Sequence, residues 1–214
     1  MGLGADEMMR ASTAHALWRI SALPELPAPR DVFRIAFEGG GLLLVGAHGE
    51  LLRRATIVHA DEADDWVFVL VLPHATDDIP DDFELRQQAA LRDATEYLDS
   101  SCTADALFDA VARDDFDAFC DALAAVHAAN RAALIENGHP AELSEQERDV
   151  IACMLAGGAR FAGRALTGLG LFGLIRGGPA SRALRRSLVQ HLGYFGPRVM
   201  ATICDNRGVV LNDS

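Results

Sequence analysis

The glycines near the start of the chain stand where a phosphate group could be bound. Gly2 and Gly4 directly precede a predicted helix over residues 5–22, and the free N–H groups at a helix start can cradle a phosphate. Asp6 and Glu7 fall in the first turn of the same helix, where their charges oppose a bound phosphate. The segment therefore predicts either a phosphate-binding turn or a frayed terminus.

A second glycine-rich segment, residues 167–177, lies in the last third of the chain. Its glycines, Gly168, Gly170 and Gly173, allow the backbone to approach a ligand or a neighbouring strand closely. On physical grounds alone, strand packing is the favoured interpretation, and a ligand-binding turn is the alternative.

Other common catalytic and metal-binding arrangements are not found in the sequence. None of the seven histidines has a spacing, such as His-Glu-x-x-His, that places two ligands on one helix face. There is no Gly-x-Ser-x-Gly elbow and no cysteine beside a histidine. His48 and His59 lie near the acidic residues 61–65, which can supply metal oxygens, but a solvated acidic turn is the favoured interpretation. We predict no metal site.

The charge of the chain excludes several classes of function. All 19 basic residues are arginine, so a Schiff-base enzyme or a lysine-dependent phosphate loop is excluded. The 31 acidic residues give a net charge of −12, which argues against binding of nucleic acid or of an anionic membrane. Small molecules or proteins are the expected partners.

The arginines are concentrated near the C-terminus. Residues 144–214 hold nine arginines and five acids, whereas residues 1–143 hold ten arginines and 26 acids. The two parts are either differently solvated faces or, on a sharper hypothesis, the C-terminal part binds an anion.

The cysteines and the hydropathy predict a reduced, cytoplasmic protein. Cys102, Cys120, Cys153 and Cys204 are scattered, and the last three fall in apolar patterns typical of small core residues. The sequence begins with no signal-peptide pattern, and no apolar run reaches the roughly 20 residues of a membrane span.

Strands are predicted first along the chain, followed by helices. The predicted strands are Val32–Phe37, Leu42–Val45, Ala55–His59 and Trp66–Leu72. The last of these is apolar on both faces, which predicts a central strand ended by Pro73. Helical periodicity then covers residues 83–98, 107–111 and 116–130, and Ser144 with Glu147 forms a capping box for a further helix.

The C-terminal part returns to strands. Pro179 can start a helix that carries Leu184 and Leu188, and Gly193 can end it. The runs 198–204 and 209–211 are predicted to form a closing hairpin. Strands, a helical block and strands again indicate the α+β class.

Several motifs occur in one order along the chain. Gly-Leu-Gly precedes a helix, Phe-Glu-Gly-Gly occupies residues 37–40, an apolar strand runs from Trp66 to Pro73, and the glycine-rich segment leads to Asn-Arg-Gly at 206–208. In this order the motifs resemble the GHMP kinase superfamily, and within it the beta-ribofuranosylaminobenzene 5'-phosphate synthases of methanopterin biosynthesis. The resemblance covers nearly the whole chain, as the later half to two-thirds of such a protein.

The resemblance implies a fold and a division into domains. It implies an antiparallel or mixed sheet with a central helical block. Residues 61–214 would form the GHMP-kinase-like C-terminal, ferredoxin-like lobe, and residues 1–60 a remnant of the N-terminal lobe. Members of the family have strands before the Gly-Leu-Gly, so we expect a missing first lobe or a start codon further upstream.

The resemblance also implies a transferase. Such enzymes join the phosphoribosyl group of phosphoribosyl pyrophosphate to an aminobenzoate or hydroxybenzoate, with loss of pyrophosphate and carbon dioxide. Pyrophosphate needs donors and a Mg²⁺ ion around it. Arg182 and Arg198 are further candidates by position, and no catalytic residue is assigned. The phosphate-binding residues implied are Gly2, Gly4, Gly168, Gly170, Gly173 and Arg176.

Departures from the family pattern support a second hypothesis. Ala5 and Asp6 replace Ser or Gly, and Gly170-Leu171 replaces Ser-Ser, which removes hydroxyl donors worth about 1 kcal/mol each. The alternative is therefore a non-catalytic GHMP-fold relative that acts as a dimeric binding or assembly module. A homodimer is expected from the sheet that a missing lobe would expose.

Overall fold

The computed structural model describes residues 39–45, 50–72, 89, 101–139, 141–166, 170–193 and 196–206. Outside these ranges lie Gly2, Gly4 and Gly168, together with the predicted elements at 5–22, 32–37 and 209–211 and all but one residue of 83–98. The described residues fall into two compact units. One contains residues 58–203, and the other contains residues 39–57 and 204–206.

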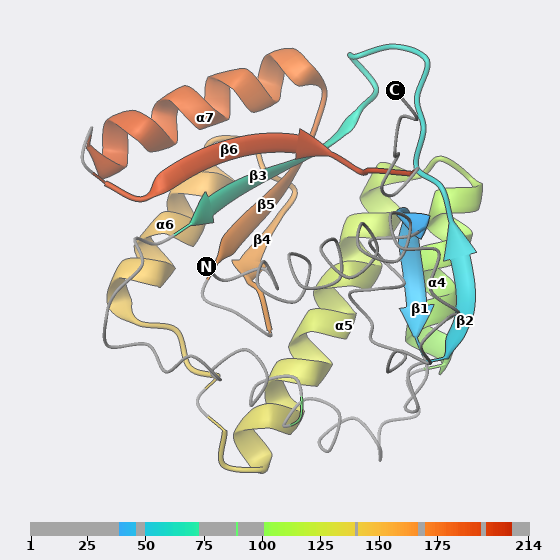
Figure 1. The fold of residues 1–214 in the computed structure, drawn as a ribbon. Helices are drawn as coiled ribbons and strands as arrows, with labels where there is room; N and C mark the ends of the chain where they lie inside the picture. The colour runs from blue at the N-terminus through green and yellow to red at the C-terminus, as the bar shows by residue number, and fades with distance from the viewer. Residues whose placement is uncertain are drawn as a thin grey trace, which may run out of the picture. The chain divides into compact units, whose positions relative to one another are not determined.

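The larger unit is built on a four-stranded antiparallel sheet (Figure 1). Its strands are β3 (Trp66–Leu72), β4 (Phe161–Arg164), β5 (Leu171–Arg176) and β6 (Arg198–Ile203). They lie in the order β4-β5-β3-β6. β3 has a neighbour on each side, which confirms the central strand that its apolar run predicts.

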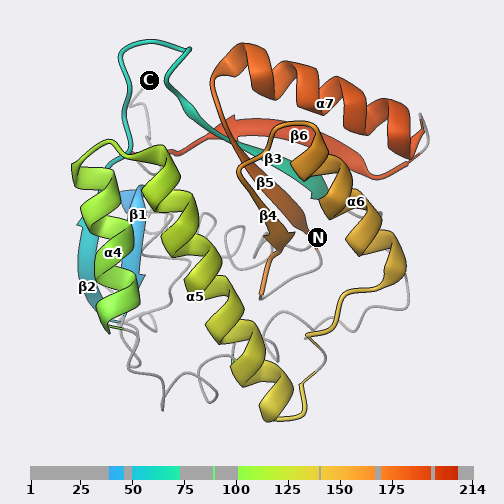
Figure 2. The ribbon, with the colours of Figure 1, turned by 180° about the vertical axis from the view of Figure 1, so that it is seen from behind.

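Within the described residues, four helices accompany this sheet (Figures 1 and 2). α4 (Ser101–Ala112), α5 (Phe116–Glu136) and α6 (Glu145–Ala156) follow β3, and α7 (Gly178–Leu192) joins β5 to β6. The four strands together with α6 and α7 follow the chain order β3, α6, β4, β5, α7, β6. This order of elements, with the strand order β4-β5-β3-β6, defines a ferredoxin-like fold. The predicted α+β class and the central helical block are confirmed.

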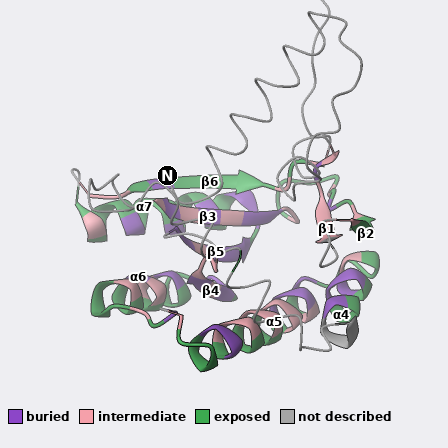
Figure 3. Cartoon of the chain, turned by 60° about the horizontal axis from the view of Figure 1, so that its bottom comes forward, coloured by how far each residue is buried: buried purple, intermediate pink, exposed green. Residues whose placement is uncertain are grey.

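The two faces of the sheet pack against different helices. One face forms a buried cluster with α6 and α7, and Met154 and Leu188 in this cluster are fully buried. On the other face, Trp66 lies against α5, with ring centroids 5.6 Å from Phe116 and 5.0 Å from Phe119. In Figure 3, β3 is buried or half-buried, while the edge strand β6 is mostly exposed.

The predicted start of α6 is confirmed at the level of single hydrogen bonds. The hydroxyl of Ser144 accepts a bond from the N–H of Glu147, and the Glu147 carboxylate accepts one from the N–H of Ser144. These two bonds satisfy N–H groups that have no partner inside the helix. They also fix the carboxylate of Glu147, which matters for the site below.

The smaller unit contains a hairpin of β1 (Leu42–Val45) and β2 (Leu51–Ala55). The predicted strand at residues 55–59 is wrong, because β2 ends at Ala55. Instead, the side-chain amide of Asn206 accepts a bond from Ile57 N at 2.8 Å and donates one to Ile57 O at 2.7 Å. The backbone of Ile57 thus finds its partners in a side chain that is distant in sequence, and no strand is needed there.

Candidate functional site

A glycine-containing turn joins β4 to β5. Arg164 is the last residue of β4, and the N–H of Ala165 donates to the carbonyl of Gly170 at 2.8 Å, which closes the turn. Gly170 is buried and directly precedes β5, and Gly168 lies in the same connection but outside the described residues. Of the predicted phosphate-binding residues, Gly168 and Gly170 therefore belong to one connection.

Gly173 and Arg176 lie away from this turn. Gly173 is in the middle of β5, where a Cβ atom would be only 3.2 Å from the sulfur of Met154 and 3.3 Å from Cβ of Ala159. Arg176 ends β5, and six residues of extended strand separate it from Gly170 by roughly 20 Å. Gly170 and Arg176 thus cannot contact the same phosphate, and Gly173 serves the packing of α6 on β5.

Arg176 and Arg182 both bind the acidic segment 61–65. A guanidinium N–H of Arg176 donates to Asp64 at 2.7 Å, and Arg182 forms an ion pair with Glu62. The N–H of Gly178, in the first turn of α7, donates to the carbonyl of Glu62. These side chains are about half exposed, so the pairs contribute little stability. Their arginines are engaged by carboxylates.

The segment that precedes β3 holds a buried histidine. The side chain of His59 is 6% exposed, and its Nε2 lies 2.9 Å from Asp114, with Asp65 at 3.8 Å from Nδ1. His48 lies outside the described residues. Among the residues that the structure describes, no three or more His, Cys, Asp or Glu side chains are grouped so that they could hold a metal ion.

Three basic side chains, which the sequence reasoning did not assign to a site, lie near the end of β4. Nε2 of His127, on α5, lies 2.7 Å from the backbone carbonyl of Arg164. Arg131 donates to the carbonyl of Ala141 at 3.0 Å, and Arg164 donates to the carbonyl of Glu142 at 3.3 Å. Because Ala141 and Glu142 are adjacent, the two guanidinium groups meet the same short loop beside the turn.

Arg164 also forms an ion pair with the fixed carboxylate of Glu147. The two groups are 3.3 Å apart, and their side chains are 18% and 20% exposed. Burial raises the pKa of Glu147, but hydrogen bonds from Ser144 and the charge of Arg164 outweigh it and lower the pKa below its usual value. Glu147 is therefore ionised near neutral pH. Its negative charge offsets the positive charge of Arg164, whereas Arg131 does not share this ion pair.

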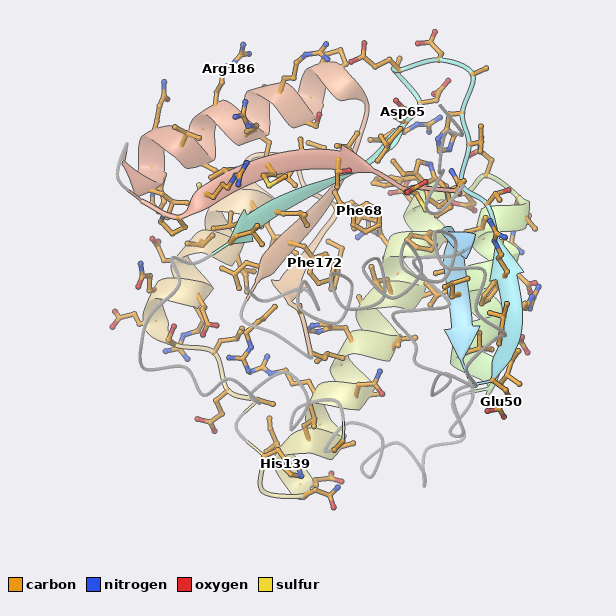
Figure 4. All side chains as sticks on the ribbon, viewed as in Figure 1. Glu50, Asp65, Phe68, His139, Phe172 and Arg186 are labelled. Atoms are coloured by element: carbon orange, nitrogen blue, oxygen red, sulfur yellow. The ribbon has the colours of Figure 1, made fainter. Side chains whose placement is uncertain are left out.

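His127 is held tightly against β4. A Cβ atom at Gly163 would be 3.2 Å from both Cε1 and Nε2 of the imidazole, so a larger residue there would push the ring away by a few tenths of an ångström. The ring packs edge-on to Phe161 at 5.6 Å and to Phe172 at 6.4 Å between centroids. Figure 4 shows Phe172 on the side of β5 that faces α5.

The pKa of His127 is lowered from 6.5, first by burial and then by the charges of Arg131 and Arg164, against the hydrogen bond to the Arg164 carbonyl. The imidazole is therefore neutral near pH 7. Since a carbonyl oxygen can only accept, the proton of the neutral ring is on Nε2. Nδ1 then carries a lone pair, and it has no hydrogen-bond partner within the described ranges.

This lowered pKa predicts that His127 destabilises the fold in acid. As the pH falls below 6.5, the unfolded chain takes up a proton that the folded chain does not, so the free energy of unfolding falls. The loss approaches about 1.4 kcal/mol for each unit by which the folded-state pKa is lowered. The charged groups that act on the ring are Arg131, on α5, and Arg164, on β4.

Urea unfolding of the wild type and of His127→Gln, repeated from about pH 5 to pH 8, measures this effect. The difference between the two proteins isolates His127 from the other histidines. We expect the wild type to lose stability relative to the variant as the pH is lowered. A difference that is independent of pH, or that has the opposite slope, contradicts the lowered pKa.

The sequence contains one signal that links His127 to Arg131, namely their spacing along α5. His127 and Arg131 are four residues apart, so they project from the same side of the helix. Their contact with β4 joins residues 37 apart in sequence, and no local pattern encodes it.

Cys120 and Cys204 do not provide a nucleophile. Cys120 is buried, as predicted, and burial raises the pKa of its thiol to about 12. Burial also raises the pKa of Cys204, and Cys153 and Cys204 are half-buried free thiols. A thiolate nucleophile is not available at Cys120 or Cys204 near neutral pH.

The α+β fold described above is similar to that of GHMP-kinase-like proteins of known structure. The chain is similar in structure to homoserine kinase from Cytophaga hutchinsonii (TM-score 0.51, 15% identity, 82% of this chain and 52% of that one). It is also similar to mevalonate diphosphate decarboxylase from Staphylococcus aureus (TM-score 0.53, 13% identity, 77% of this chain and 50% of that one).

These likenesses show the fold alone. The chain spans about half the length of each of the two proteins. No family model and no curated protein sequence matches it. None of the helices within the described ranges has the length and apolar character needed to cross a membrane.

Proposed function

We propose that this chain binds a phosphorylated small molecule at the glycine turn between β4 and β5 and acts as a phosphoribosyl transferase. The donor would be phosphoribosyl pyrophosphate, and the acceptor an aminobenzoate or hydroxybenzoate, as the motif order suggests. One observation carries the proposal: Arg131, Arg164 and His127 lie near the end of β4, where the glycine-containing connection to β5 begins, in a protein with the GHMP kinase fold.

The chemistry of the turn suits a phosphate. Backbone N–H groups in a turn can form an anion-binding concavity, and arginine adds strong charge-assisted hydrogen bonds. Glu147 offsets the charge of Arg164, so Arg131 supplies the net positive charge at this place. That charge would stabilise both a bound phosphate and a departing pyrophosphate.

Mg²⁺ would accompany a pyrophosphate group and neutralise part of its charge. The described residues offer no cluster of carboxylates or histidines for it. A requirement for Mg²⁺ stays a prediction.

Replacing Arg131 with glutamine is expected to weaken the binding of phosphoribosyl pyrophosphate by about tenfold, since a hydrogen bond to a charged group contributes about 1.5 kcal/mol or more. Isothermal titration calorimetry measures the change. Arg186→Gln removes the same charge from an exposed position on α7 and is the matched control. Equal affinities for the two variants would contradict binding at the turn.

Release of pyrophosphate in the presence of benzoate acceptors tests catalysis separately from binding. The alternative function, a non-catalytic dimeric binding or assembly module, is favoured by Leu171. This residue stands where the resembled family has a hydroxyl, and it is buried in the core. A homodimer in sedimentation that binds phosphoribosyl pyrophosphate without releasing pyrophosphate would support the alternative.

A further inference from the structure

We propose that the free edge of β6 binds an extended peptide segment of a partner protein, in which apolar residues are followed by two acidic residues. Such a segment would join the four-stranded sheet as a fifth strand. The inference goes beyond the proposed function and does not depend on it, since β6 and β4 form opposite edges of the sheet.

The hydrogen bonds of β3 show which backbone groups of β6 are left for a partner. The N–H of Gly177 donates to the carbonyl of Asp65 at 2.8 Å, directly beyond the paired residues of β5 and β3, so Asp65 faces β5. Because the backbone groups of successive residues point to opposite sides of a strand, the even-numbered residues of β3 and β6 bond to each other. The odd-numbered residues of β6 turn their N–H and C=O groups to the free edge, namely Val199, Ala201 and Ile203.

This edge is exposed and only partly covered. No described strand pairs with it, and five of the six residues of β6 are exposed (Figure 3). Nε of Arg185, on α7, donates to the carbonyl of Val199 at 3.1 Å, and the hydroxyl of Thr202 donates to the carbonyl of Ile203 at 3.1 Å. Between them, neither backbone group of Ala201 has a partner among the described residues. An exposed edge of this kind is a template for a further strand.

The charges at the start of β6 define the chemistry of the partner. Arg185 and Arg198 are exposed, and neither pairs with a carboxylate of the described residues, in contrast to Arg176 and Arg182. In a chain of net charge −12, two such guanidinium groups favour an acidic partner. A carboxylate binds a guanidinium more strongly than a neutral carbonyl does, so an acidic strand would draw Arg185 away from Val199 and free that carbonyl.

The apolar residues of β6 set the order of residues in the partner. Met200 and Ile203 are 36% and 54% exposed, on opposite faces of the strand. All pairs of this sheet are antiparallel, and residues opposite each other in such a pair lie on the same face. An added strand therefore needs apolar residues opposite Ile203 and Met200. Acidic residues should follow opposite Val199, beside Arg185, and opposite Arg198.

The fluorescently labelled peptide Val-Thr-Val-Leu-Glu-Glu has this order, and Val-Thr-Val-Leu-Gln-Glu lacks only the carboxylate beside Arg185. Anisotropy titrations of both peptides test the inference. We expect the wild type to bind the first peptide roughly tenfold more tightly than the second. Arg185→Gln should abolish this preference. Arg186→Gln is the matched control and should keep it, because Arg186 lies midway between the buried Leu184 and Leu188 and so projects from the opposite side of α7.

Amide hydrogen exchange provides a second readout that unspecific attraction between charges would not change. The first peptide should slow the exchange of the edge-facing amides of Val199, Ala201 and Ile203, and leave the amides of Met200 and Thr202, which bond to β3, unchanged. Equal binding of the two peptides by the wild type, or binding without this alternating protection, overturns the inference.

Protection of the edge-facing amides in the absence of peptide also overturns the inference. If that protection depends on protein concentration, a second copy of the chain occupies the edge, and if it does not, another segment of the same chain does. Affinity for phosphoribosyl pyrophosphate is measured separately, so failure of the peptide to bind leaves the proposed function untouched.

Discussion

Replacing Leu188 with alanine is expected to lower the free energy of unfolding by about 3 kcal/mol. The side chain of Leu188 is 0% exposed and lies in the cluster that joins α7 to the sheet. Truncation removes buried methyl groups and leaves a cavity, because the strands on one side and α6 on the other limit how far the site can collapse. Urea unfolding followed by circular dichroism measures the loss.

The adjacent residue provides the control for this prediction. Val189 follows Leu188 on α7 but is 38% exposed, so Val189→Ala should cost about 1 kcal/mol or less. A similar loss in both variants would mean that α7 does not pack on the sheet through the face described above. The ferredoxin-like arrangement would then be wrong at α7.

The elements that could be predicted from the sequence are those whose signal is local. The apolar run of β3, the capping box at Ser144 and the periodicity of α7 with Gly193 at its end all have their cause within one element. β2 could not be predicted in this way. Its leucines, Leu51 and Leu52, are 47% and 58% exposed, so the strand has no buried apolar face that would mark it in the sequence. The strand was therefore predicted at residues 55–59 instead.

The candidate site was predicted in part for the same reason. Glycine spacing drew attention to Gly170 and Gly173 together, but in a strand the two residues have different environments. Gly170 closes the turn, whereas Gly173 lies beneath Met154 of α6. The charged partners of the turn were missed because Arg131 meets Ala141 and His127 meets Arg164 through folding of α5 against β4.

Several of the arginines concentrated near the C-terminus form ion pairs within the larger unit. Arg176 and Arg182 bind carboxylates of the segment 61–65, and Arg164 binds Glu147. Much of the positive charge is thus paired inside the larger unit. Arg131 lies before residue 144, so the charge that we assign to phosphate binding comes from the acidic part of the sequence.

Replacing Gly173 with valine is expected to lower the free energy of unfolding by about 2 kcal/mol, since extra methyl groups would be forced into a packed core. A Cβ atom at this position is already 3.2 Å from the sulfur of Met154 and 3.3 Å from Cβ of Ala159. The high strand propensity of valine offsets part of this cost. Urea unfolding measures the net change.

A double-mutant cycle with Met154→Ala identifies the cause. Because Met154 is fully buried over Gly173, its truncation makes room for the valine. Gly173→Val should therefore cost at least about 1 kcal/mol less in the Met154→Ala background than in the wild type. Additive losses would show that the clash lies elsewhere. If the valine variant instead keeps its stability but loses affinity for ribose 5-phosphate, then Gly173 serves a ligand and not the packing of α6, and the phosphate site must extend along β5 beyond the turn.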